Sequence, residues 1–226
     1  MWDVISWSKG LAVEIAGQDV IHHAGAAALR IIADRTGLTA GLSRALARRG
    51  FVPVEDRGRV LADTAVLIAD GGRVLSDLAT LRDQAQLLGP VAWDPTLWRA
   101  LSEIGEDQRG KVARARAKTR EHVWSLLVKR HGRIPPSRVA DRDLGTTIVI
   151  RMDASLVTAH SDKELATGTY TGTFGHHPLT AWCDNTFESL ALKLRKGSAG
   201  SNPATDHIEG WTRQSPRSRP PTAATC

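Results

Sequence analysis

The sequence predicts an α+β protein in which helices come first and strands follow. Up to about residue 131, leucine and alanine recur at helical spacing, and the periodic segments end at glycines. From Thr146 onward, β-branched residues at short spacing replace that pattern, as in "TTIVIRMDASLVTAH". The segment between them, "GRIPPSRVADRDLG", is punctuated by proline and glycine and is typical of a linker. We therefore expect a helical region over residues 1–135, a linker over 136–145 and a β region over 146–209.

The helical region contains several separate helix patterns. We expect helices in "HHAGAAALRIIADRTG", "LTAGLSRALARRG", "RGRVLADTAVLIADGG", "RVLSDLATLRDQAQLLGP", "DPTLWRALSEIG" and residues 106–131. Asp94 before Pro95 is a good helix start. One apolar face of the last helix is expected to hold Val112, Ala115, Thr119, Val123, Leu126 and Leu127.

The β region is expected to be antiparallel. "GTYTGTFGHHPLTAWCDN" continues the strand pattern, and "ESLALKLRKG" reads as a half-buried strand. In the latter, Leu190, Leu192 and Leu194 alternate with Ala191, Lys193 and Arg195. The tail over residues 210–226 has no periodicity and is rich in proline and arginine, so we expect it to be disordered.

The overall charge favours a polyanionic partner. The net charge is +6 and the pI is about 9.8, which makes nucleic acid the first hypothesis, with a basic surface of no special role as the alternative. Cys183 and Cys226 imply no disulfide framework, and there is no signal-peptide pattern or long apolar run. A cytoplasmic, nucleoid-associated protein with no membrane contact is expected.

Basic residues concentrate on the last predicted helix. From Arg109 to Arg138 there are ten lysines or arginines and a single acid, Glu121. A solvated helix face is the plain interpretation, but the near absence of acids favours contact with DNA phosphates. The residues predicted for this contact are Arg109, Lys111, Arg114, Arg116, Lys118, Arg120, Lys129 and Arg130. In "LTAGLSRALARRG", Arg44, Arg48 and Arg49 would face a DNA groove if this were a recognition helix; an amphipathic packing helix is the alternative.

A carboxylate ends the first strong strand pattern of the β region. Ile148, Val149 and Ile150 lead directly into Asp153, and burying a carboxylate is costly unless something offsets it. A turn or cap residue is one interpretation, and a ligand for a divalent metal is the other, since Mg²⁺ takes one or two carboxylates together with waters and phosphate oxygens.

Several motifs in order resemble one known family. They are "SWSKGLAVEIAG", "GRVLADTAVLIADGGRVLSDL", "TLWRALSEI", "IRMDASLVTAHSDKELA", "GTFGHHPLTAWCDNT" and "LRKGSAGSN". Together they resemble the DDE transposases of bacterial insertion sequences, of the insertion-sequence 1380 family, over residues 1 to about 209. The resemblance implies a ribonuclease-H-like catalytic domain with three acidic residues, of which Asp153 matches the first. It also implies Mg²⁺ or Mn²⁺ as cofactor and the element's terminal inverted repeats, as double-stranded DNA, as partner.

Other residues of these motifs have open roles. His160, Ser161, Asp162 and Lys163 follow the family pattern, so that Lys163 is a candidate DNA contact, although a polar turn is equally compatible. His176 and His177 favour structural roles, because adjacent strand residues point to opposite faces. Asp184 lies in a turn composition, "CDNT", and is not assigned to catalysis. Three departures from the family stand out: Thr171 replaces a usual lysine, Phe187 a usual glycine, and Pro203 falls where the family begins a helix.

The family pattern stops after "DHIE", before the second and third acids. The codons of the tail, written in degenerate form and moved back by one base, can encode an apolar helix that resembles the family's own continuation. We therefore expect a frameshift near Gly210 and a truncated, inactive transposase. The alternative is a regulator that occupies the terminal repeats without catalysis, and the oligomeric state, including a homo-oligomer, stays open. A different nuclease of ribonuclease-H type is a third interpretation, and it would need Asp184 or Glu188 as a second carboxylate.

Overall fold

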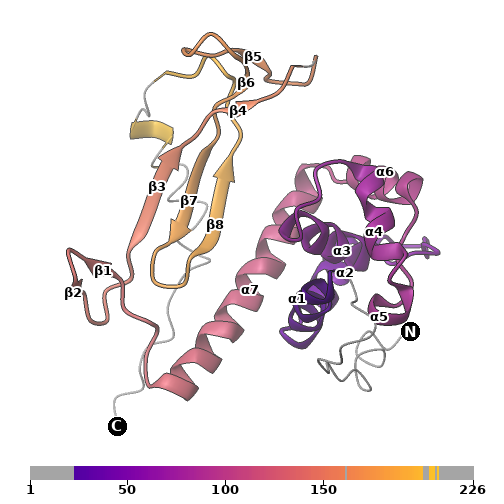
Figure 1. Ribbon diagram of the computed structural model, residues 1–226, viewed down its shortest axis with the longest axis horizontal. Helices are drawn as coiled ribbons and strands as arrows, with labels where there is room; N and C mark the ends of the chain where they lie inside the picture. Colours follow the sequence, from indigo (N-terminus) through magenta and orange to yellow (C-terminus); the bar gives the residue numbers. More distant parts are fainter. Residues whose placement is uncertain (1–22, 161, 201–203, 207, 209–226) are drawn as a thin grey trace. The chain divides into compact units, whose positions relative to one another are not determined.

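The computed structural model describes residues 23–160, 162–200, 204–206 and 208, and its fold class is α+β (Figure 1). The chain divides into two compact units, one ending at His122 and the other beginning at Val123. This division falls inside a helix and earlier than the boundary expected at residue 135. The predicted tail, residues 210–226, lies outside the described residues. No helix in the described part of the chain is long and apolar enough to cross a membrane.

The first unit consists of short helices around one apolar core. The helices are α1 (Ala24–Arg35), α2 (Leu38–Leu46), α3 (Arg57–Ala69), α4 (Leu78–Arg82), α5 (Ala85–Leu88) and α6 (Asp94–Ser102), with a 3₁₀ turn at Leu75–Asp77 before α4. The buried core side chains come from almost every one of these elements, and they include Ala26, Val60, Val66, Leu78, Leu81, Leu88 and Leu97. Burying these apolar surfaces is what holds such short helices in place, because helices of this length are marginal on their own.

A buried ion cluster links α1 to α3 inside this unit. The Arg30 side chain is 0% exposed and donates to the carboxylates of Asp34, one turn along α1, and of Asp63 on α3. Burial lowers the pKa of Arg30 to about 10, so the guanidinium stays charged at neutral pH. A buried charge is tolerated only when it is paired, so this cluster fixes how α1 and α3 face each other.

Three helix predictions need correction. The helix expected over residues 73–90 is broken into the 3₁₀ turn, α4 and α5; Asp77 accepts from the backbone N–H groups of Arg73 and Val74, which holds those two residues outside the helix. Helix α2 ends at Leu46 rather than running to Gly50. Helix α6 begins at Asp94 with Pro95 next, as predicted, but the Asp94 side chain accepts from Arg82 and not from its own helix.

Helix α7 (Glu106–His131) is the longest element of the chain. Its predicted apolar face is partly confirmed: Ala115 packs where α2 passes, and an added Cβ at Gly41 would lie 3.4 Å from the Ala115 Cβ. Leu126 of that face is exposed, however, and the fully buried aromatic of α7 is Trp124, which packs with Cys183 and Leu190 in the core of the second unit.

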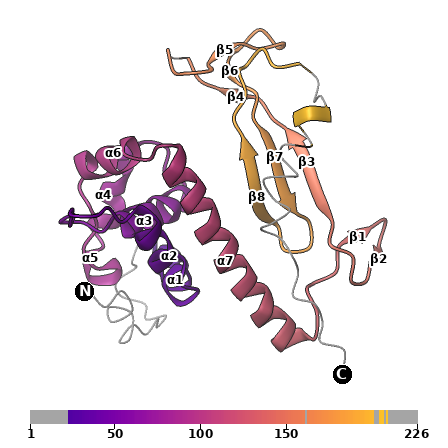
Figure 2. The same ribbon diagram turned by 180° about the vertical axis from the view of Figure 1, so that it is seen from behind.

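The second unit is made of antiparallel strands, as expected. They are β1 (Arg138–Val139), β2 (Arg142–Asp143), β3 (Ile150–Ala154), β4 (Val157–Thr158), β5 (Thr167–Gly168), β6 (Phe174–His176), β7 (Leu179–Cys183) and β8 (Glu188–Lys193). β7 is the middle strand of the sheet β3–β7–β8, and β6 is the middle strand of β4–β6–β5 (Figures 1 and 2).

One unbroken register joins these two sheets. Ile150 pairs with Cys183, Ala154 with Leu179, and Thr158 with Gly175, so the same offset holds from end to end. Between the two sheets, the Ser155 N–H donates to the Pro178 carbonyl. β3 and β4 therefore form one long arm of a ribbon, and β6 and β7 form the other. Since side chains alternate along a strand, this register decides which residues of both arms share a face.

A bulge in β8 reverses the face predicted for its second half. Ala181 pairs with Ala191 but Trp182 pairs with Ser189, so Leu190 is an extra residue. Leu190 stays buried, whereas Leu192 and Leu194 are exposed and Arg195 is buried. The prediction of a leucine face was wrong beyond Leu190, because a bulge shifts the alternation by one position.

The predicted linker contains a small hairpin. β1 and β2 are joined by a two-residue turn, Ala140–Asp141, in which both residues have positive φ. Such a turn matches the twist of its strands and usually carries Asn or Gly. The linker is therefore a hairpin that precedes the main sheet, and not an irregular connection.

The turn between β7 and β8 explains one departure from the family pattern. Phe187 follows Asp184, Asn185 and Thr186 in this turn, and its φ is +54°. This left-handed conformation is costly for residues with a Cβ and natural for glycine. The glycine that is usual at this position thus has a backbone reason, and Phe187 adopts the same conformation at a cost.

We predict that Phe187→Gly stabilises the second unit by about 0.5–1 kcal/mol, because relief of left-handed strain exceeds the entropy that glycine adds to the unfolded chain. The Phe187 side chain is 85% exposed, so its removal forfeits little packing. Urea unfolding followed by tryptophan fluorescence measures the change. Phe187→Ala, which keeps a Cβ, is the matched control and should show no gain; equal stabilities of the two variants would contradict the explanation.

Candidate functional site

Asp153 lies near the end of β3 on the face of the sheet that is open to solvent. On the neighbouring strands, Asp153 pairs with Thr180 of β7, which in turn pairs with Leu192 of β8. Ile150, Met152 and Ala154 take the opposite, more buried positions of the strand. The strand therefore does not bury the carboxylate: alternation turns Asp153 outward, which answers the question raised by an acid after an apolar run.

The surroundings of Asp153 hold it in place without neutralising it. Its Oδ1 accepts from the backbone N–H of Ala154 at 2.8 Å, and the Thr180 hydroxyl donates to its main-chain carbonyl at 3.0 Å. In the described part of the chain, no cation forms an ion pair with this carboxylate. An exposed carboxylate anchored through one oxygen is suited to bind a hydrated divalent cation.

Asp184, which the sequence offers as a possible second carboxylate, lies away from Asp153 and has a structural role. The Asp184 N–H donates to the Val149 carbonyl, four positions along β3 from Asp153, or about 13 Å at the usual strand rise. Its carboxylate accepts from the Ser137 hydroxyl and from Arg151 Nε, the latter at 2.5 Å. These two donors, the hydroxyl first, hold the pKa of Asp184 below its usual range. Asp184 is a clamp between the segment before β1 and the sheet, as expected of a turn residue.

The described residues provide one metal ligand but not a complete metal site. No three His, Cys, Asp or Glu side chains in the described ranges come together to hold an ion. Mg²⁺ can be held by one or two carboxylates with waters, so Asp153 suffices as one ligand. A two-metal phosphoryl-transfer centre needs further acids, and we derive no catalytic step through this site.

The predicted DNA contacts on α7 differ in their availability. Most are exposed, whereas Arg120 is only 7% exposed and is the least accessible of the predicted contacts. Arg109 is exposed and paired with Glu106 at 2.7 Å. Lys111, Arg114 and Lys118 form the clearest stripe: they are spaced for one helix face and exposed, and no ion pair is found for them within the described ranges.

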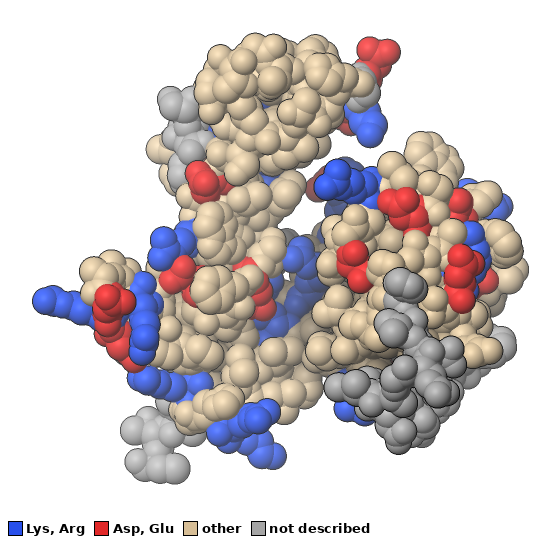
Figure 3. Space-filling model, viewed as in Figure 1, with Lys and Arg blue, Asp and Glu red and all other residues tan. Residues whose placement is uncertain are grey.

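Basic side chains also gather near the C-terminal end of α7 and around the β1–β2 hairpin (Figure 3). Lys129 and Arg130 are exposed in the last turn of α7, as predicted for DNA contact. Arg133, which follows the helix, is paired with Asp143 of β2 at 3.2 Å. Arg138 and Arg142 of the hairpin are exposed as well, so the positive charge in this part of the second unit comes from both α7 and the hairpin.

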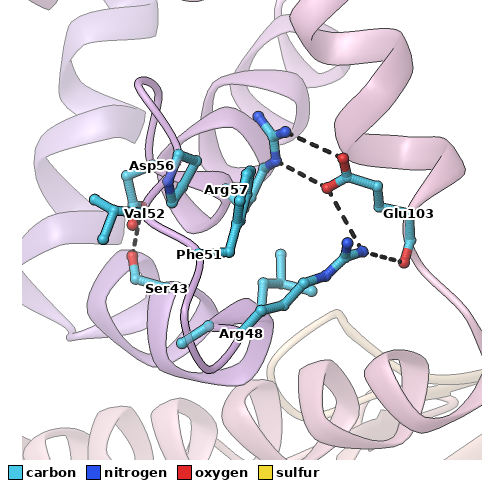
Figure 4. Close-up of a pocket in the computed structure, with 10 residues that line it drawn as sticks. Ser43, Arg48, Phe51, Val52, Asp56, Arg57 and Glu103 are labelled. Carbon is cyan, nitrogen blue, oxygen red and sulfur yellow. Dashed lines mark hydrogen bonds and ion pairs between the residues drawn. The ribbon is translucent and has the colours of Figure 1, made fainter.

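Helix α2, the predicted recognition helix, is buried on one side and exposed on the other. One side of α2 is buried through Thr39, Leu42 and Leu46, as in an amphipathic packing helix. Arg44 is exposed on the other side. Arg48 lies beyond the helix end, and its Nη2 lies 3.2 Å from the Glu103 carbonyl and 3.6 Å from its carboxylate (Figure 4). Arg48 is therefore presented from beyond α2 and beside Glu103, and its contact with DNA stays a prediction.

Arg48 lines a hollow of about 130 Å³ that the sequence did not reveal. Arg57 donates twice to the Glu103 carboxylate, at 3.1 and 3.2 Å, and these bonds lower the pKa of Glu103 (Figure 4). Ser43 donates to Asp56, which also caps α3 through the Arg59 N–H. The polar groups of the hollow satisfy one another, so it is a structural joint and offers no free acid, base or nucleophile.

A turn that begins at Lys163 precedes β5: the Lys163 carbonyl accepts from the Ala166 N–H, and the lysine is exposed. Ser161 lies outside the described residues. An exposed lysine in a turn is compatible with both interpretations left open by the sequence. Both histidines that follow have structural partners: His176 Nε2 lies 3.1 Å from the Glu164 carbonyl and His177 Nδ1 lies 2.9 Å from that of Ala199.

Sequence reasoning missed two residues that hold the site together. Asn185 is 6% exposed; its Oδ1 accepts from Val149 N–H, and its Nδ2 donates to the carbonyls of Pro135 and Thr147. Asp206 accepts from Lys193 and Arg195, which lowers its pKa. A turn composition shows that an asparagine is tolerated there. It does not show that the amide bonds two distant segments, at Pro135 and at Thr147–Val149, so no local signal could have found this role.

We predict that the Asp184 clamp contributes stability that acid removes. A carboxyl whose pKa is lower in the folded than in the unfolded chain stabilises the fold at any pH above its pKa in the unfolded chain, which is near 4. This contribution is lost as the pH falls through the pKa that the carboxyl has in the folded chain. Asp184→Asn should therefore flatten the loss of stability below about pH 4, and Ser137→Ala should flatten it in part. Thermal unfolding across pH gives the comparison, and an Asp184→Asn profile parallel to that of the parent chain would refute the clamp.

The sequence as a whole matches one family of DNA-processing enzymes. The family described as "Transposase DDE domain group 1" matches residues 5–222. No curated protein and no solved structure matches the chain. DDE transposases act in DNA transposition, bind DNA, and carry out phosphoryl transfer, generally with divalent metals. Because the match covers nearly the whole chain and includes the strand that carries Asp153, the chain belongs to the group 1 family of DDE-domain transposases.

Proposed function

We propose that the chain is a transposase of the insertion-sequence 1380 type, with Asp153 as the first metal-binding carboxylate. The observation that supports this most is the outward position of Asp153 near the end of β3, on an open sheet face. The motifs quoted above, in order along the sequence, support the finer family assignment. In this proposal, the sheet β3–β7–β8 is the first part of a ribonuclease-H-like domain.

We further propose that the chain alone does not cut DNA. The described surroundings of Asp153 contribute one carboxylate, while Asp184 is occupied by Ser137 and Arg151. One carboxylate cannot hold two metal ions for in-line attack on a phosphate. The predicted frameshift near Gly210 would account for the missing acids, whereas the family match runs on to residue 222. The nucleotide sequence downstream of codon 209 decides between a frameshift and an in-frame continuation.

A DNA-binding regulator is the second candidate function. It is favoured by the exposed stripe Lys111, Arg114 and Lys118, which needs no catalytic site to bind phosphates. Such a protein would occupy the element's terminal repeats through α7 and through Arg44 of α2, and would block the complete enzyme. Catalysis and binding can be measured separately, so two experiments distinguish the candidates.

For catalysis, we predict no Mg²⁺- or Mn²⁺-dependent cleavage or joining of terminal-repeat DNA by the purified chain. Gel analysis of end-labelled DNA measures both reactions, with Asp153→Ala as the control for contaminating nuclease. Cleavage by the parent chain that disappears in Asp153→Ala would overturn the proposal of inactivity, and would mean that another carboxylate completes the site.

For binding, we predict that the chain binds duplex DNA and that replacing Lys111, Arg114 and Lys118 together with alanine weakens binding to all sequences. Each lost phosphate contact should reduce the slope of log affinity against log salt concentration by roughly 0.9. Fluorescence anisotropy at several salt concentrations measures this slope.

The matched control for this experiment replaces Arg35, Arg73 and Arg99, three exposed arginines of the first unit outside α7. It removes the same charge and should change the slope much less. Equal effects of the two triple variants would assign binding to net charge alone, and absence of binding at low salt would remove both candidate functions that require DNA.

A further inference from the structure

The β5–β6 hairpin ends in a rigid three-residue loop, Tyr170–Gly172. Thr169 N–H donates to the Thr173 carbonyl at 2.8 Å, and Gly172 N–H donates to the Thr169 carbonyl at 3.1 Å. Gly172 has a φ of +78°, the left-handed residue that such loops require. The loop is therefore closed by its own backbone.

Tyr170 presents its ring at the tip of this loop. The side chain is 78% exposed, and its ring centroid lies 5.9 Å from that of His177, at an interplanar angle of 56°. His177 is itself anchored through Nδ1 to the Ala199 carbonyl. One side of the tyrosine is thus supported while most of the ring is open, an arrangement that contributes little to folding and leaves an aromatic surface free.

Three threonine hydroxyls gather beside Tyr170. The Oγ1 atoms of Thr169, Thr171 and Thr173 lie 2.7 to 3.2 Å from one another, and Thr169 Oγ1 also donates to the Thr173 carbonyl at 3.1 Å. Thr171 and Thr173 are exposed and Thr169 is half-buried, so the two exposed hydroxyls are the ones that a ligand can reach. Loop residues 169–173 carry no charge. Clustered hydroxyls donate to phosphate oxygens without selecting a base, and an uncharged aromatic stacks on any base.

The tip belongs to the same ribbon as Asp153. Thr180 pairs with Asp153, and Thr173 lies seven positions before Thr180 along the β6–β7 arm, about 23 Å at the usual strand rise. Residues 175–179 between them are buried, so the tip is a separate surface at the end of the same arm.

We propose that this hairpin tip binds an unpaired nucleotide, with the base stacked on Tyr170 and the adjoining phosphate hydrogen-bonded by the threonine hydroxyls. The inference rests on the proposed role in DNA transposition, and it deepens that role by naming single-stranded DNA as a ligand of the second unit. The interior of duplex DNA does not satisfy the tip, because each base inside a duplex is already stacked on both of its neighbours.

The test uses the fact that the chain has a single tyrosine. Incorporation of a fluorinated tyrosine gives one fluorine NMR signal, which reports on Tyr170 alone. Addition of oligothymidylate should shift this signal and saturate, whereas a blunt duplex of equal length should leave it unchanged even where anisotropy shows that the duplex is bound.

Variants separate stacking from folding. Tyr170→Ala should weaken binding of oligothymidylate by about 5- to 100-fold, the range found when a stacking aromatic is removed, and Tyr170→Phe should stay within about twofold of the parent chain. Trp98→Ala, at an exposed aromatic of α6, is the control and should have no effect.

The outcomes distinguish this inference from the proposed function. A chain that binds duplex DNA but whose fluorine signal ignores oligothymidylate would overturn the hairpin site and leave the proposed function intact. A chain that binds no DNA of either kind would overturn both. A signal that moves with protein concentration in the absence of DNA would assign the tip to self-association and also overturn the inference.

Discussion

The antiparallel register that pairs residues 150–158 with residues 175–183 determines where each functional side chain of the second unit lies. It turns Asp153 outward, sets Thr180 beside it, and carries the same ribbon on to the hairpin tip at Tyr170. A shift by one residue would move Asp153 to the face that packs against Trp124, where an unpaired carboxylate is costly. The chemistry of this unit therefore depends on how firmly the register is fixed.

Two groups of contacts fix it. Asn185 bonds the start of β3 and the segments at Pro135 and Thr147, while Asp184 ties Ser137 to Arg151 on the same strand. Both residues belong to the turn that ends with Phe187. Leaving a buried amide without its hydrogen bonds costs more free energy than those bonds contribute when they form. Registers that would break the hydrogen bonds of Asn185 are therefore disfavoured. In the first unit, the buried Arg30 cluster has the corresponding role between α1 and α3.

The sequence predicted the parts of this architecture that depend on local pattern. Helical spacing and glycine ends located α1, α3 and α6, and β-branched runs located β3 and β7. The motif around Asp153 located the candidate carboxylate, and the departure at Phe187 corresponds to a positive φ. Other features depend on how elements pack and pair. The pairing of Arg48 with Glu103, the burial of Arg120 and the bulge at Leu190 leave no trace in periodicity or composition, because only the folded arrangement of helices and strands determines them.

The central claim is that Asp153 is the carboxylate through which the open sheet face binds a divalent metal. Paramagnetic broadening of backbone amide signals by Mn²⁺ tests it most directly, because the effect falls steeply with distance and detects weak binding. The account predicts broadening centred on Asp153 and Thr180 that is lost in Asp153→Asn and kept in Asp184→Asn. Broadening centred on Asp184 or Asp206, or broadening unaffected by Asp153→Asn, would contradict it.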